Sequence, residues 1–163
     1  MSAGAGAGIG YSTMRGRDYP VIRQFTVFLE NRVGQLLELV RRFEGSNVKI
    51  VALSINDASE CAFVRFVVSH PERGREILER AGFAIIESDL ICVELPDVSQ
   101  PLLQICAALL QAEINIVQTY PLIHQPHGRP VLAMMVDNLE GAQETLTAKG
   151  FRMMTEEDLQ SEE

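Results

Sequence analysis

The sequence lacks the features that mark membrane, nucleic-acid-binding and nucleotide-dependent proteins. No stretch of 18 apolar residues occurs, so we expect no membrane-spanning helix. Lys and Arg form no cluster, and the formal net charge is −8 at pH 7. We expect no nucleic-acid partner, because phosphates require a basic surface. Neither GxGxxG nor GxxxxGKS/T occurs, and we expect no cofactor.

Cysteine is also scarce. Cys61, Cys92 and Cys106 are an odd number of residues without CxxC spacing, and each lies in an apolar segment. This pattern predicts buried thiols in a reducing compartment rather than a disulfide framework. Because the N-terminal residues lack the apolar centre of a signal peptide, we expect a cytoplasmic location.

The three histidines lie in predicted loops, far from the cysteines in sequence: His70, His124 and His127. A catalytic thiol needs a base within reach, so we expect no enzyme activity. His124 and His127 could supply two metal ligands, but two ligands do not close a site and neither Cys nor a carboxylate is close by in sequence. A metal-responsive regulator is therefore the least favoured alternative, and we predict no metal site.

What the sequence does contain is an internal duplication. Residues 48–51, Val-Lys-Ile-Val, recur as residues 114–117, Ile-Asn-Ile-Val, and a Gly-Phe pair at residue 82 recurs at residue 150. Each copy is about 70 residues long, the size of a small domain rather than of a solenoid repeat. Two copies of a small domain favour a binding protein over an enzyme.

The duplication sets the expected domain organisation. Residues 1–20 are rich in Gly and Ala and have neither helical nor strand periodicity, so we expect a disordered tail. Residues 21–89 and residues 90–163 are expected to form the first and second domains.

Hydrophobic periodicity predicts the order βαββαβ in both copies. In the first copy, strands and helices are expected at residues 24–30, 36–43, 48–55, 61–68, 71–81 and 83–88. In the second copy they are expected at residues 90–94, 100–111, 114–122, 131–137, 139–149 and 151–155. We predict an α+β protein of two tandem ferredoxin-like domains, each a four-stranded antiparallel sheet with two helices on one face.

The second face of the sheet carries apolar residues too. In the strand at residues 61–68, Phe63 and Val67 alternate with Val64, Phe66 and other apolar side chains. We therefore expect both faces to be buried, most simply by stacking of sheets in a homodimer.

A βαββαβ unit with the turn Glu30-Asn31-Arg32-Val33-Gly34-Gln35-Leu36, followed by a strand that begins like Ile114-Asn115-Ile116, resembles the ACT domain. The resemblance covers residues 22–159, and as a stand-alone pair the chain is similar to small tandem-ACT, amino-acid-binding regulatory proteins of bacteria. It implies a non-catalytic, allosteric regulator. Its expected partners are a small effector, usually an amino acid, a second copy in a homodimer, and an enzyme of amino-acid metabolism.

The resemblance also implies a site, because ACT domains pair through the first helix and the edge strand and hold the effector at that seam. An asparagine offers both donor and acceptor to a zwitterion, and a glycine lets backbone approach closely. We expect the ligand-binding residues to be Asn31, Arg32, Val33, Gly34, Gln35, Leu36, Asn47, Val48 and Ile50.

Alternative interpretations stay open. An Asn before a Gly-containing turn is also an ordinary way to pass from strand to helix. In the second copy, Ser99 stands where Gly34 stands in the first; we expect Ser99 to cap the following helix and that site to be degenerate or differently specific. The chain could also be an assembly subunit for a metabolic enzyme, without a ligand of its own.

Overall fold

A computed structural model of the chain describes residues 19–30, 34–57 and 61–160. By their internal packing these residues divide into two compact units. The N-terminal unit is Arg23–Ser88, and the C-terminal unit is Asp89–Glu163 together with residues 19–22.

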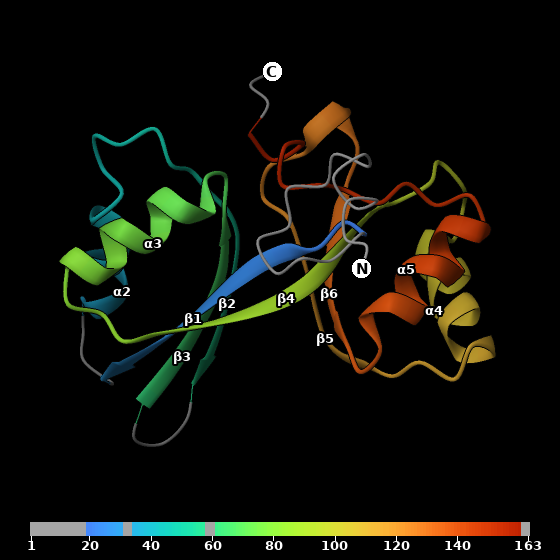
Figure 1. Cartoon of the computed structure of the whole chain (residues 1–163), viewed down its shortest axis with the longest axis horizontal. Helices are drawn as coiled ribbons and strands as arrows, with labels where there is room; N and C mark the ends of the chain where they lie inside the picture. The colour runs from blue at the N-terminus through green and yellow to red at the C-terminus, as the bar shows by residue number, and fades with distance from the viewer. Residues whose placement is uncertain (1–18, 31–33, 58–60, 161–163) are drawn as a thin grey trace, which may run out of the picture. The chain divides into compact units, whose positions relative to one another are not determined.

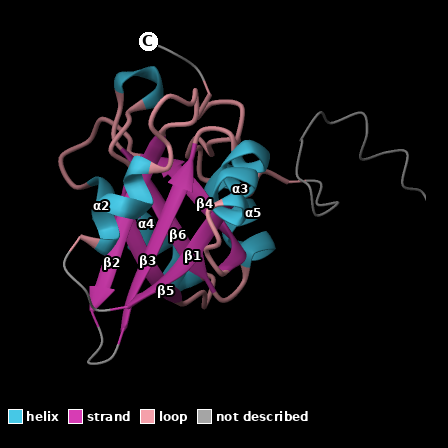
Figure 2. Cartoon of the chain, turned by 90° about the vertical axis from the view of Figure 1, so that its left-hand side faces the viewer, coloured by secondary structure: helices cyan, strands magenta, loops and turns pink. Residues whose placement is uncertain are grey.

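The N-terminal unit places its helices on one side of its strands (Figure 1). Its elements are β1 (Ile22–Glu30), α2 (Gln35–Arg41), β2 (Ile50–Asp57), β3 (Cys61–Val68), α3 (Pro71–Arg80) and the first part of β4 (Ile85–Glu94). Strand β3 pairs antiparallel with both β1 and β2, so that Phe66 lies opposite Phe25 on one side and opposite Leu53 on the other. Figure 2 shows β2 as the outermost of these strands. The core contains Phe25, Val27, Leu29, Leu39, Phe43, Val48, Val64, Phe66, Val68 and Leu78.

The C-terminal unit repeats this plan. It contains the second part of β4, α4 (Pro101–Gln111), β5 (Ile116–Pro121), the 3-10 helix η1 (Pro126–Gly128), β6 (Val131–Val136) and α5 (Leu139–Ala148). Strand β6 pairs antiparallel with β4 and with β5. Helices α4 and α5 contact each other (Figure 1). Their inward side chains, including Ile105, Leu109 and Leu146, pack against Ile91 and Met134.

The sheet differs from the prediction. Instead of two four-stranded sheets, the strands have the order β2-β3-β1-β4-β6-β5 in one six-stranded sheet. The strands expected at residues 83–88 and 90–94 are one continuous strand, β4. The physical reason is local: residues 85–94 contain neither Gly nor Pro, so nothing in this segment breaks the extended backbone.

The strand expected at residues 151–155 is reduced to one bridge, between Val93 and Met153. Two backbone hydrogen bonds flank it: Glu94 N–H donates to the Arg152 carbonyl at 2.9 Å, and Met154 N–H donates to the Cys92 carbonyl at 2.8 Å. The chain then turns, because the Asp158 carboxylate accepts a hydrogen bond from the Thr155 amide at 2.8 Å. This hydrogen bond from backbone to side chain takes the place of the backbone pairing that would extend the strand.

The second face of the N-terminal sheet is only partly covered. Phe28 and Phe63 meet edge to face, with ring centroids 5.0 Å apart, yet Phe28 keeps 44% of its surface exposed and Phe63 is half-buried. Within one chain, therefore, this face is not fully covered at Phe28. The homodimer inferred from it stays a prediction.

Candidate functional site

The turn before α2 carries the first part of the predicted site. Gly34 adopts φ +91°, a left-handed conformation that favours glycine, and a Cβ built there would have no atom within 4 Å. The backbone is thus open to close approach. Gln35 and Leu36 follow in the first turn of α2; Gln35 is half-buried, and Leu36 packs at the margin of the core. Asn31, Arg32 and Val33 lie outside the described residues.

A groove runs beside the outward face of α2. It has a volume of about 500 Å³ and is lined by Leu37, Val40, Arg41, Phe43, Glu44 and Ile50. Leu37 is 57% exposed, and Val40 is exposed as well. The lining therefore combines three aliphatic side chains with one cationic and one anionic group, a combination suited to a small zwitterion with an apolar side chain.

The second part of the predicted site consists of Asn47, Val48 and Ile50, and these three residues lie in different places. Ile50 lines the groove, Asn47 is exposed, and Val48 is buried in the core. Gly34 precedes α2 and Ile50 follows it, so a helix of seven residues, roughly 10 Å long, separates the two parts. Within one N-terminal unit, Leu36 and Ile50 nevertheless pack against the same hydrophobic core.

The corresponding turn of the C-terminal unit has its own cavity of about 410 Å³. The cavity is lined by Leu95, Pro96, Asp97, Pro101, Gly128, Arg129 and Pro130. Ser99 is exposed but does not cap α4: the N-cap is Gln100, whose side chain makes no capping hydrogen bond, and Pro101 occupies the first turn. The predicted cap is therefore wrong, because proline in the first turn sets the helix start without one.

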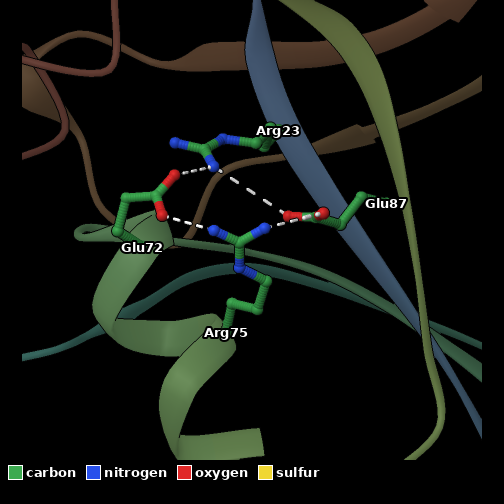
Figure 3. Close-up of polar contacts among 4 residues, drawn as sticks. All are labelled: Arg23, Glu72, Arg75 and Glu87. Atoms are coloured by element: carbon green, nitrogen blue, oxygen red, sulfur yellow. Dashed lines mark hydrogen bonds and ion pairs between the residues drawn. The ribbon is translucent and has the colours of Figure 1, made fainter. Parts of the chain in front are cut away.

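Sequence reasoning missed an ion-pair cluster in the N-terminal unit (Figure 3). Arg23 on β1 donates to Glu72 in the first turn of α3 and lies 3.9 Å from the carboxylate of Glu87 on β4. Arg75 contacts Glu72 at 2.5 Å and Glu87 at 3.5 Å. The hydrogen bond from Arg23 lowers the pKa of Glu72 most. Burial opposes it, and the charges of Arg23 and Arg75 lower the pKa further. Two cations and two carboxylates compensate one another, so the cluster has a structural role.

The two histidines of the predicted loop lie in different surroundings. Among the described residues, no group of three His, Cys, Asp or Glu side chains is arranged to hold a metal ion. His127, in η1, lies 3.8 Å from a carboxylate oxygen of Glu94 and 3.8 Å from one of Asp158. Arg152 approaches the same ring at 3.4 Å. These contacts tie η1 to β4 and to the C-terminal segment.

The cysteines differ from one another. Cys92 is buried, as predicted, and burial raises the pKa of its thiol. Cys61 is half-buried and Cys106 is exposed, so the prediction of a buried thiol is wrong for Cys106. Its apolar neighbours form the outward face of α4, which sequence periodicity alone did not separate from the inward face.

No helix among the described residues is both long and apolar enough to span a membrane. Among curated proteins, no sequence matches this one.

Solved structures resemble the fold. Protein BT0572 from Bacteroides thetaiotaomicron superposes with a TM-score of 0.79 at 23% identity, over 88% of this chain and 99% of that chain. The regulatory subunit of aspartate kinase from Thermus thermophilus, in a ligand-free form, has a TM-score of 0.54 at 11% identity, over 80% of this chain and 92% of that chain. At these identities the likeness shows the fold.

The family is shown by a family model. The model of the ACT domain pair matches residues 20–162, which contain both compact units, the turn at Gly34 and the groove beside α2. ACT domains are regulatory ligand-binding domains of a non-catalytic type. The chain belongs to the ACT domain family, as an ACT domain pair.

Proposed function

We propose that this protein is an amino-acid sensor, a cytoplasmic regulator that binds its effector where the N-terminal units of two copies meet. The observation that carries the proposal is the groove beside α2, which is lined by aliphatic side chains together with Arg41 and Glu44. The two expected domains, residues 21–89 and 90–163, belong to the same proposal.

The lining of the groove supports an amino acid as ligand. The Arg41 guanidinium is a donor for a carboxylate, and the Glu44 carboxylate is an acceptor for an ammonium group. Leu37, Val40 and Ile50 offer apolar surface to an aliphatic side chain. The expected effector is therefore an aliphatic amino acid.

The position of the predicted residues supports a second copy as part of the site. Gly34 is the N-cap of α2, whereas the groove residue Ile50 begins β2, after the helix has ended. An antiparallel pairing of α2 and the edge strand β2 with those of a second copy would set the turn of one unit beside the groove of the other. Such an isologous pairing makes two equal sites.

Regulation of an enzyme is the expected output. The aspartate kinase subunit that shares the fold is a regulatory subunit, which supports an enzyme of amino-acid metabolism as the partner of this chain too. Effector binding shifts the assembly, or its affinity for that enzyme, by as much as the effector's affinities for the two states differ.

A thermal-shift panel of the purified protein with the twenty amino acids at millimolar concentration tests the proposal. An effector at 100 times its Kd adds about 2.7 kcal/mol, which corresponds to several degrees in Tm for a chain of this size. We expect a selective rise with aliphatic amino acids. If no amino acid raises the Tm, the sensor hypothesis is wrong, and the result favours an assembly subunit without a ligand.

A further inference from the structure

A hollow lies where helix α4 meets the end of helix α5, in the C-terminal unit. The two helices contact each other (Figure 1), and the hollow has a volume of about 430 Å³. Small-molecule sites in proteins have volumes of roughly 300–1,000 Å³. The lining residues are Gln104, Ala107, Ala108, Gln111, Lys149 and Phe151. None of them lines the groove beside α2 or the cavity at the turn before α4, so this hollow is a separate place on the surface.

The lining is built on one helix face and one anchored turn. The four lining residues of α4 have the spacing i, i+3, i+4 and i+7, so they lie on one face of that helix. Lys149 is the C-cap of α5, and Phe151 packs against the core of the C-terminal unit. Between them Gly150 adopts φ +89°, a conformation that favours glycine. Packing therefore holds both sides of the hollow, as in a preformed site.

The two copies of the duplication differ at this place. Helices α2 and α4 start at equivalent positions of the duplication, so Glu38 and Arg42 correspond to Gln104 and Ala108. In the N-terminal unit, Glu38 and Arg42 form an ion pair with 3.1 Å between nitrogen and oxygen. In the C-terminal unit a neutral amide and a methyl group take these positions. The change removes the carboxylate and the long side chain, and it leaves room on the helix face.

The C-terminal unit also carries a cation that the N-terminal unit lacks. Lys149 precedes the recurring Gly-Phe pair, and its counterpart before the first Gly-Phe pair is Ala81. Among the described residues, the Lys149 ammonium has no ion-pair partner. A cation is favourable at the C-terminus of a helix, which accounts for a lysine at this position but leaves its charge available to an anion in the hollow.

The chemistry of the lining selects a class of ligand. The Lys149 ammonium attracts a carboxylate, and the amides of Gln104 and Gln111 offer further donors and acceptors. Ala107, Ala108 and Phe151 supply apolar surface. Among the lining residues none is acidic, so no carboxylate compensates the charge of an ammonium group. The groove beside α2 differs in this respect, because Glu44 lines it.

We propose that the α4–α5 hollow, defined by the six lining residues above, binds a small organic carboxylate with an apolar body and no ammonium group. A 2-oxo acid, which is an amino acid with an oxo group in place of the amine, belongs to this class. The hollow lies in the C-terminal unit and the proposed effector groove in the N-terminal unit, so the inference does not rest on the proposed function.

Protection of Lys149 from acetylation tests the site in the full-length protein. The chain contains two lysines, Lys49 and Lys149, and both are exposed. We expect millimolar 4-methyl-2-oxopentanoate or 4-methylpentanoate to slow the acetylation of Lys149 several-fold and to leave Lys49 unchanged, as measured by mass spectrometry of peptides. Leucine has the same carbon skeleton with an ammonium group and should not protect Lys149. No protection by either carboxylate, equal protection of both lysines, or equal protection of Lys149 by leucine would overturn the proposal.

Two variants test the charge and the space separately, by calorimetric titration with 4-methyl-2-oxopentanoate. Lys149→Gln removes the cation and Ala107→Phe fills the hollow at an exposed position, and we expect each to weaken binding about tenfold or more. Arg80→Gln is the matched control, because it removes one positive charge from the last turn of α3 in the other unit. Far-UV circular dichroism checks folding. Unchanged binding in either folded variant, or equal weakening by Arg80→Gln, would refute the site.

Discussion

Arg23 on β1 donates a hydrogen bond to the carboxylate of Glu72 in the first turn of α3. The Arg23 side chain keeps only 7% of its surface exposed, and Glu87 approaches the same guanidinium. A buried cation is costly unless it is paired and hydrogen-bonded. This pair therefore links the start of a helix to the strand beneath it, and it makes part of the fold dependent on pH.

Glu72→Gln should reveal that dependence. Because the pKa of Glu72 is lowered from its ordinary value of 4.5 in the folded protein, the ionised group stabilises the fold above that value, and this stability is lost as pH falls through the folded pKa. We expect the variant to be less stable than the parent by about 1 kcal/mol at pH 7. The difference should shrink as pH falls below 4.5, as measured by urea denaturation at several pH values.

Glu79→Gln is the control for this series. Glu79 is an exposed carboxylate in the last turns of the same helix, so its replacement should change stability little at any pH. A Glu72→Gln effect that is equal at pH 7 and pH 3 would show that the Arg23 contact contributes no pH-dependent stability.

Gly74→Ala should destabilise the protein even though it lies in a helix. Alanine normally favours a helix by about 1 kcal/mol over glycine. Here a Cβ would lie 2.8 Å from Cγ2 of the buried Val68, and such overpacking costs about 1–3 kcal/mol. We expect a lower midpoint in chemical denaturation. Glu76→Ala, at an exposed position of the same helix, should be near neutral; a stabilised Gly74→Ala would contradict the close packing.

Cys92 should be unreactive in the native protein. Burial and the nearby charge of Glu156 both raise the pKa of its thiol, and the thiolate is the reactive form. In a Cys106→Ser background, we expect a thiol reagent to label half-buried Cys61 and to reach Cys92 only in denaturant. Mass spectrometry of peptides distinguishes the two sites. Native labelling of Cys92 at the rate of Cys61 would show that the C-terminal unit opens readily around β4.

The sequence predicted the elements of this fold better than their connections. The pattern of apolar residues marked β3 from Cys61 to Val68 and the start of α3 at Pro71 as the structure has them. It could not show that β4 runs on from residue 85 to residue 94, because duplication suggests a boundary where the backbone has no break. Whether two adjacent strands are one or two depends on tertiary pairing, which periodicity does not record.

The sequence predicted some local features of the candidate site but not the residues that line the groove. Gly34 was identified by its turn chemistry and does adopt a positive φ. Val48 was expected at the seam but lies in the core. The sequence did not distinguish the two positions, because a β-branched residue at the start of a strand is typical of both. Arg41 and Glu44 line the groove but were not singled out, since charged residues near a helix end are usually solvated. The Arg23 cluster joins β1 to α3 across 49 residues of sequence, and no local pattern marks it.

The division of the proposed site between two copies leads to a prediction about mixtures. Asn31→Ala should abolish amino-acid stabilisation without unfolding the protein, because Asn31 is expected to hold the polar groups of the effector. Arg41→Glu should do the same from the other side, by reversing the charge that faces the carboxylate. Arg41 is exposed, so the fold should survive this change.

If the effector lies between the turn of one copy and the groove of another, the two inactive variants should restore binding when mixed. A heterodimer of Asn31→Ala with Arg41→Glu contains one site with both changes and one site with neither. Random pairing in an equal mixture then returns about a quarter of the sites, measurable by calorimetric titration with the effector found in the panel. Each variant alone is the control. If both variants are folded and inactive but their mixture binds nothing after exchange of subunits, the effector site lies within one chain, and the seam between copies is not where this protein senses its ligand.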